Sequence, residues 1–175
     1  MEVWLTKVRF PPIADAQHGF WACLQTTHCG HSRPPRTLAL MTRIDLNGLE
    51  AARQLAALSP QTQHRFDEAL SFGWTGSEQV TQAFRAIGSA IASKRQPVSD
   101  TDKKKLFAFA ERLLKQASPE VSNAVATCMV GQIWTATRES GFDFSLVDPY
   151  LGSEARRYAI ALDDFHKTKT IGLTR

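Results

Sequence analysis

The chain has 175 residues, of which 43% are hydrophobic, with 21 basic and 17 acidic side chains. This length and composition are ordinary for a globular domain that buries its own core, without disulfides or metal ions to stabilise it. No run of about 18 consecutive apolar residues is present, so the sequence predicts no membrane-spanning segment. The three cysteines cannot all pair, and the N-terminal residues lack the pattern of a secretory signal, so we expect a cytoplasmic protein.

Residues 1–40 differ from the rest of the chain in composition. They hold four of the eight prolines and three of the five histidines, and their apolar residues follow neither a helical nor a strand period. We therefore predict a poorly ordered N-terminal arm. The stretch Val8–Asp15 resembles a segment that recurs at the starts of unrelated bacterial proteins, which suggests translation upstream of the true start and Met41 as the alternative initiator.

Four residues of this arm are of types that bind zinc: Cys23, His28, Cys29 and His31. Their separations of five, one and two residues do not reproduce the paired spacing of a zinc finger. A structural zinc site is therefore the less favoured alternative, and we predict no metal site in the chain.

The first predicted helix spans about residues 46–58, where Leu and Ala recur at helical spacing. Ser59 and Pro60 are typical of a helix start, and Gly73 is expected to end the second helix. The inward-facing residues predicted for this second helix are Phe66, Leu70 and Phe72.

The third predicted helix opens near Thr75 or Ser77 and ends before Pro97. Its apolar residues recur at steps of four, three and four, which places them on one stripe: Val80, Phe84, Ile87 and Ile91. Ser99 or Asp100 caps the fourth helix, whose start carries three lysines that we expect to be exposed. Its predicted inward residues are Leu106, Phe109, Ala110, Leu113 and Leu114.

The fifth predicted helix runs from Pro119 to Glu139 and is apolar over most of its circumference, so we place it at the centre of the fold. Gly141 is a typical helix stop. Ser153 is expected to cap the last helix, whose predicted inward residues are Ala155, Tyr158, Ala161, Leu162 and Phe165.

Six helices joined by short loops predict an all-α protein, either a single-domain bundle or a stack of helical pairs. We assign residues 41–167 to this domain and residues 168–175 to a C-terminal tail.

Residues with catalytic potential have structural explanations that we favour. Cys128 falls on the apolar face of the fifth helix, as expected of a small core residue. The carboxylates have the positions expected of loops and turns (Asp143 and Asp148) or of a solvated helix face (Asp163 and Asp164). No glycine-rich phosphate-binding loop is present in the sequence. We therefore predict a protein that is not an enzyme and needs no cofactor.

The distribution of charge also argues against nucleic-acid binding. The formal net charge of +4 is divided evenly between residues 1–40 and residues 41–175. The densest basic run is only three residues long, Lys103–Lys105, whereas nucleic-acid binders usually concentrate basic residues on one face.

Three segments, Phe107–Leu114, Pro119–Thr127 and Val147–Tyr158, carry a resemblance to a family. In this order they resemble a family of small bacterial all-helical proteins of unassigned biochemistry, over about residues 106–166. The family has a Glu-Arg-Leu-like helix end, a central helix rich in Val and Ala, and a Tyr-Leu-Gly element that opens the last helix. This chain differs from the pattern at Ala155, where a serine is expected. Some members look like immunity-type partners of toxins, so the resemblance implies a partner-binding role.

The candidate partner-binding residues are Tyr150, Arg156 and Arg157, in the element that opens the last helix. The alternative for the two arginines is an ion pair within the chain, with Asp148, Glu111 or Glu139. Our leading interpretation is a protein-binding domain that neutralises a bacterial toxin. The second is a small nucleic-acid-binding or regulatory domain that uses the charges of Lys103–Lys105 and of the two arginines.

Overall fold

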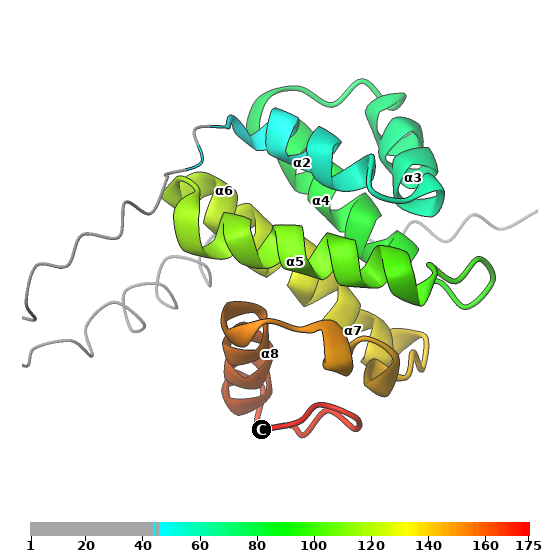
Figure 1. The fold of residues 1–175 in the computed structure, drawn as a ribbon, viewed down its shortest axis with the longest axis vertical. Coiled ribbons are helices and arrows are strands. Elements are labelled where there is room, and N and C mark those ends of the chain that lie inside the picture. The colour runs from blue at the N-terminus through cyan, green and yellow to red at the C-terminus, as the bar shows by residue number, and fades with distance from the viewer. Residues whose placement is uncertain (1–43, 45) are drawn as a thin grey trace, which may run out of the picture. The chain divides into compact units, whose positions relative to one another are not determined.

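The structure is a computed structural model that describes residue 44 and residues 46–175. The predicted arm, its four candidate zinc ligands and Met41 lie outside the described residues. Within the described part the chain forms helices and no strands, which confirms the predicted all-α fold (Figure 1). The helices are α2 (Gly48–Ala56), α3 (Pro60–Leu70), α4 (Gly76–Ile91), α5 (Asp100–Gln116), α6 (Pro119–Ala124), the π-helical segment η1 (Val125–Val130), α7 (Gly131–Glu139) and α8 (Ser153–Phe165), with 3₁₀ turns at Phe144–Leu146 and Asp148–Tyr150.

Side-chain caps and prolines explain where several helices begin. Asn47 Oδ1 accepts the Glu50 N–H at 2.8 Å before α2, and Ser99 Oγ accepts an N–H in the first turn of α5 at 3.1 Å. Pro60 and Pro119 occupy the first positions of α3 and α6, where a missing N–H costs no hydrogen bond. These signals are local, so the helix starts lie within two residues of the predictions.

The long central helix predicted for residues 119–139 is continuous, but its middle is the π-helical segment η1. This segment packs against α4 at Gly88, where a Cβ atom would lie only 2.6 Å from the Met129 carbonyl oxygen. Figure 1 shows α2, α3 and α4 on one side of α5 and α8 on the other. The core between them is built from the fully buried side chains of Leu55, Phe84, Ile87, Leu106, Leu113, Met129 and Ile133.

Several of the predicted inward or outward positions are wrong. Phe72 follows the end of α3 and is 70% exposed, and Phe165, at the last position of α8, is also exposed. Asp163, expected on a solvated face, is 1% exposed. Conversely, Phe107 and Trp134 are buried core residues that the predicted stripes did not include, whereas Cys128 lies in the core as predicted.

The predicted cap of α8 is also wrong, because Ser153 is its first residue and Gly152 its N-cap. The first N–H groups of α8 are instead bound by Glu111 of α5, which accepts from Glu154 N at 2.9 Å and from Ala155 N at 3.2 Å. Its carboxylate also accepts the Ser153 hydroxyl at 3.0 Å. A carboxylate suits the positive end of a helix, so a neighbouring helix supplies what the sequence pattern assigned to Ser153.

The C-terminal residues 168–175 pack against the helices. Thr170 donates its N–H and its hydroxyl to Asp163, at 2.8 and 2.7 Å, and Thr174 does the same to Asp148, at 2.9 and 2.7 Å. Between them Gly172 has a φ of 86° and lies so close to Ser145 that a Cβ atom would be 2.5 Å from its backbone nitrogen. The positive φ and the lack of space for a Cβ atom both require glycine at position 172. The residue at this turn therefore fits the packed position of the C-terminal segment.

None of the helices formed by the described residues has the length and apolar character needed to span a bilayer.

Candidate functional site

Arg156, the first of the predicted partner-binding residues, is engaged within the chain. Its guanidinium donates to the Asp148 carboxylate at 2.6 Å, to the Asp148 carbonyl oxygen at 2.7 Å and to the Thr174 carbonyl oxygen at 2.9 Å. It therefore joins α8, the 3₁₀ turn before it and the C-terminal segment. The intramolecular pair with Asp148, one of the alternatives from sequence, is the arrangement observed.

Tyr150 and Arg157 lie near the same end of α8 but differ in exposure. Tyr150 is half-buried, its hydroxyl is hydrogen bonded to Asp100, and the Lys103 ammonium lies 5.8 Å from its ring centre. Burial, together with Asp100, raises the pKa of Tyr150. Arg157 is exposed and forms an ion pair with Glu154 one turn earlier. Arg157 is thus the member of the predicted set whose charge stands in solvent.

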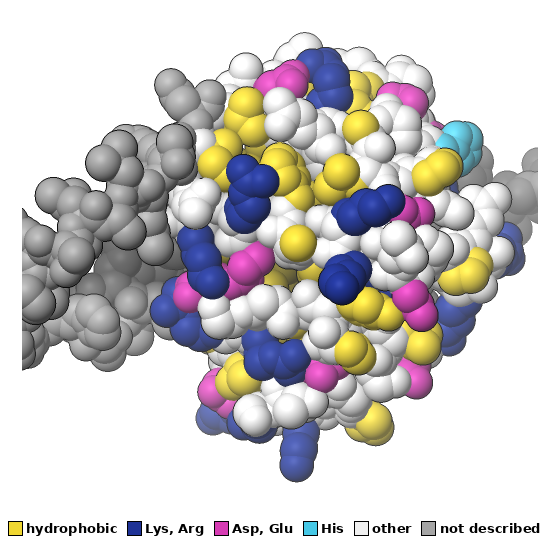
Figure 2. Space-filling view, viewed as in Figure 1, with side chains coloured by type: hydrophobic (Ala, Val, Ile, Leu, Met, Phe, Trp, Pro, Cys, Tyr) yellow, Lys and Arg dark blue, Asp and Glu magenta, His cyan; other side chains and the backbone are white. Residues whose placement is uncertain are grey.

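The lysine run at the start of α5 is not uniformly exposed, contrary to the sequence-based expectation. Lys103 is 7% exposed and pairs with Asp100 at 3.1 Å, and Lys105 pairs with Asp102 at 3.2 Å. On the face shown in Figure 2, basic side chains are spread out with acidic ones between them. The described residues on this face therefore form no continuous basic surface of the kind that tracks a phosphate backbone.

The loop between α3 and α4 exposes two large aromatic side chains. Phe72 is 70% exposed and Trp74 is 37% exposed, and the whole stretch from Ser71 to Glu78 lies at the surface. Gly73 and Gly76 have φ values of 73° and 60°, a conformation that other residues rarely adopt. These glycines allow the turns of a loop in which Phe72 is largely exposed and Trp74 is partly exposed.

Acidic side chains accompany this aromatic pair. Asp67 and Glu68 lie in the last turns of α3, and Glu78 lies in the first turn of α4, all of them exposed. Arg65 is the one lysine or arginine between Pro60 and Val80, and it is paired with Glu68 at 2.7 Å. We call Phe72, Trp74 and these three carboxylates the aromatic loop surface. Its charge is negative although the chain as a whole is positive.

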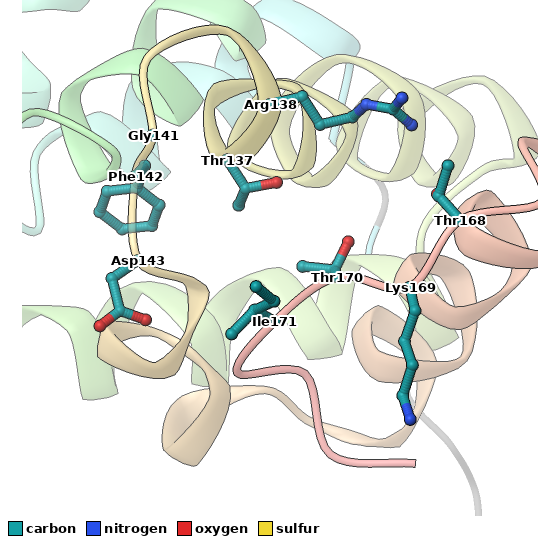
Figure 3. A pocket seen from close by; sticks show the side chains of 9 residues that line it. All are labelled: Thr137, Arg138, Gly141, Phe142, Asp143, Thr168, Lys169, Thr170 and Ile171. Carbon is teal, nitrogen blue, oxygen red and sulfur yellow. The ribbon is translucent and has the colours of Figure 1, made fainter.

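A cleft of about 520 Å³ lies between the end of α7 and the C-terminal segment (Figure 3). It is lined by Thr137, Arg138, Gly141, Phe142, Asp143 and the four residues 168–171. In Figure 3 the Arg138 and Lys169 side chains lie on one side of the cleft and extend in different directions, whereas Asp143 lies on the opposite side. The cleft is therefore basic on one side and acidic on the other.

The wall formed by residues 168–171 is anchored from behind by Asp163. This carboxylate accepts the Trp134 indole N–H at 2.9 Å as well as both donors of Thr170. Burial would raise the pKa of Asp163, but these donors and Arg175 lower it below its ordinary value. Asp163 therefore remains charged at neutral pH and holds the wall in place.

The Trp134 side chain also supports the basic side of the cleft. His166 stacks on it with ring centres 4.9 Å apart, and the Arg138 guanidinium lies 5.2 Å from its ring centre. Arg138 is thus positioned by a cation–π contact and forms no ion pair with a carboxylate of the described residues. Its charge is therefore not neutralised by a carboxylate of the described residues.

No group of three or more His, Cys, Asp or Glu residues in the described part of the chain is arranged to hold a metal ion. Tyr158 is largely buried, which raises its pKa to about 12. The residues that sequence reasoning missed are Phe72 and Trp74, although the segment Ser71–Gly76 carries a signal: two large aromatic residues flank Gly73, the predicted helix stop, and a second glycine follows at Gly76.

Comparison of the chain with protein-family models, with curated proteins and with solved structures finds no match.

Proposed function

We propose that the protein is a binding domain for another protein, and that its role is to neutralise a bacterial toxin in the cytoplasm. The observation that carries this proposal is the exposure of Phe72 and Trp74 in one short loop. Trp and other aromatic residues are enriched among the residues that dominate the energy of protein interfaces. Phe72 and Trp74 are exposed on one loop and are not part of the core, so they can serve as anchor residues of an interface.

The carboxylates of the aromatic loop surface define the partner further. Asp67 and Glu68 near the end of α3, and Glu78 in the first turn of α4, give the helix ends on both sides of the loop an acidic rim. Such a rim accelerates association with a basic protein and disfavours acidic ones. A partner with an apolar pocket bordered by Lys and Arg is therefore the complementary surface.

The test is co-expression of the chain with the product of the adjacent gene, followed by purification and calorimetry. We expect a one-to-one complex that survives raised salt, since an apolar centre supplies most of its affinity. Phe72→Ser and Trp74→Ser should each weaken it by about 2 kcal/mol or more. Leu146→Ser is the matched control, because Leu146 is a large exposed apolar residue outside this loop. Equal losses for all three variants would refute the assignment of the surface.

The nucleic-acid alternative makes the opposite prediction. Binding to DNA or RNA should fall steeply between about 50 and 200 mM salt, and the double change Lys104→Gln and Lys105→Gln should weaken it. Lys103 is left unchanged in this test because it is buried. Salt-sensitive binding that the double change weakens, with no complex formed by the gene product, would replace our proposal with the alternative.

A further inference from the structure

The outward face of α5 carries a row of basic residues over about three turns. Steps of three and four residues place five exposed side chains on one stripe of this helix: Lys104, Lys105, Ala108, Arg112 and Lys115. We call these residues the α5 stripe. The half-buried Phe109 lies beside it, with the Arg112 guanidinium 5.7 Å from its ring centre. In Figure 2, which looks onto α5, basic and apolar side chains lie next to one another across the middle of this face.

Two cations of the α5 stripe have no carboxylate partner. Lys105 and Lys115 are each paired with a carboxylate of α5 itself, at 3.2 and 2.8 Å. Lys104 and Arg112 form no ion pair with a carboxylate of the described residues. Both charges can therefore meet carboxylates of another molecule without giving up an ion pair within the chain.

The aromatic loop surface has the opposite charge and the larger apolar groups. Its carboxylates Asp67 and Glu78 form no ion pair with a lysine or arginine of the described residues. They lie on either side of Phe72 and Trp74 along the chain. Aromatic rings pack well against a guanidinium group and against small apolar side chains, and opposite charges around such a contact favour association. The α5 stripe offers both, with Ala108 between its cations.

We infer that the protein associates with itself, the aromatic loop surface of one copy binding the α5 stripe of a second copy. The α5 stripe is thus an apolar surface bordered by Lys and Arg, the kind of surface that the aromatic loop surface complements. In Figure 1 α2 lies between α5 and the connection from α3 to α4, so the two surfaces of one copy are separate. A toxin and a second copy would compete for the same loop, but the inference does not require that the partner is a toxin.

Sedimentation equilibrium of the purified chain, at concentrations up to about 1 mM, tests the inference. The average mass should rise above that of a single chain as the concentration increases. Arg112→Glu should weaken the association at least about tenfold, because it reverses an unpaired charge at the contact. Arg95→Glu is the matched control: it makes the same change at an exposed arginine outside the α5 stripe and should change the dissociation constant less than about threefold.

A mixture of two variants tests which surfaces meet. Glu78→Lys should weaken the association of the chain with itself as Arg112→Glu does. An equimolar mixture of the two variants should associate again, because the intact loop of the Arg112→Glu chain can bind the intact α5 stripe of the Glu78→Lys chain. Both positions are exposed, so both variants should keep the melting temperature of the parent chain.

The inference is overturned if the parent chain stays monomeric at about 1 mM, if Arg95→Glu acts as strongly as Arg112→Glu, or if the mixture stays monomeric. It is also overturned if Phe72→Ser leaves the association unchanged, since a different surface would then be in contact. Arg112→Glu keeps the aromatic loop surface intact and should bind the product of the adjacent gene at least as tightly as the parent chain does. Failure of the self-association and failure of the proposed function are therefore distinguishable.

Discussion

At the scale of single residues, two buried carboxylates organise the C-terminal third of the domain. Asp163 and Asp148 are each bound by the N–H and the hydroxyl of one threonine from the C-terminal segment. Each also accepts from a residue of the helical part, the Trp134 indole for Asp163 and the Arg156 guanidinium for Asp148. A buried carboxylate is tolerated only when its oxygens are satisfied in this way.

Asp163→Asn should lower the free energy of unfolding by about 1–3 kcal/mol, measured by urea denaturation. The amide nitrogen of Asn would face the Thr170 N–H, a donor against a donor, and the ionic component of the remaining bonds would be lost. Asp164→Asn makes the same change at the next residue, whose side chain is 63% exposed, and should cost less than about 0.5 kcal/mol. If the two variants were equally stable, Asp163 would not be a structural carboxylate.

At the scale of elements, the contact between α4 and η1 depends on a missing side chain. The π-helical turn brings the Met129 carbonyl against Gly88, and a helix interior is otherwise a poor place for glycine. π-Helical turns are uncommon and occur mostly as short insertions in α-helices. Here the insertion and the glycine belong to one packing arrangement.

Gly88→Ala should therefore destabilise the domain, although alanine is the better helix former. Its Cβ atom would lie 2.6 Å from a backbone oxygen, which cannot move without displacing the central helix, and we expect a loss of about 1–3 kcal/mol. Gly131→Ala is the control, since the nearest atom there is 3.7 Å away, and it should be neutral or stabilising by up to about 1 kcal/mol. Thermal unfolding of both variants measures these changes. A Gly88→Ala variant as stable as the parent chain would contradict the described packing of η1 against α4.

Glu111 of α5 caps α8 directly beside Gly152. The effects of substitutions at Glu111 and Gly152 on the free energy of unfolding should therefore not be additive. Glu111→Ala removes the acceptor of the first N–H groups and should cost about 1–2 kcal/mol. Gly152→Ala should also destabilise, because its Cβ atom would lie 2.3 Å from the Glu111 carboxyl carbon. In the double variant the second change should cost clearly less than it does alone, as a double-mutant cycle would measure. Strict additivity would mean that Glu111 and residue 152 act independently.

Sequence patterns predicted the helices well because their starts and ends depend on neighbouring residues. Asn47, Ser99 and the prolines act within one turn, so no tertiary information is needed. The cap of α8 and the burial of Asp163 depend on residues far along the chain, and local patterns cannot reveal them. For the candidate site, glycine and aromatic composition hinted at the aromatic loop surface, whereas the cleft exists only once residues 168–171 have packed beside α7.

At the scale of the whole molecule, the free energy of unfolding should depend on pH in the acidic range. Burial would raise the pKa of Glu111, Asp148 and Asp163, but their hydrogen-bond donors and cations lower all three below their ordinary values. A group whose pKa is lower in the folded chain stabilises the fold above its unfolded pKa, and this contribution is lost as the pH falls toward its folded pKa. The three contributions act in the same direction.

We therefore expect the free energy of unfolding to be nearly constant down to about pH 5 and to fall between about pH 5 and pH 2. Urea denaturation at a series of pH values measures this slope. In the Asp163→Asn variant the slope should be smaller, because one of the three titrating groups is gone. A free energy that rose with acidification would contradict the bonding of these carboxylates.

The attachment of the C-terminal segment also has a consequence for synthesis in the cell. Thr170 and Thr174 emerge from the ribosome after every helix of the domain, yet they satisfy Asp163 and Asp148 within it. While the chain is still being translated, the helices can assemble only with these two carboxylates lacking their threonine donors. The last step of folding must therefore follow the release of these residues from the ribosome, and nascent chains stalled before Thr170 should be more sensitive to proteases than the finished protein.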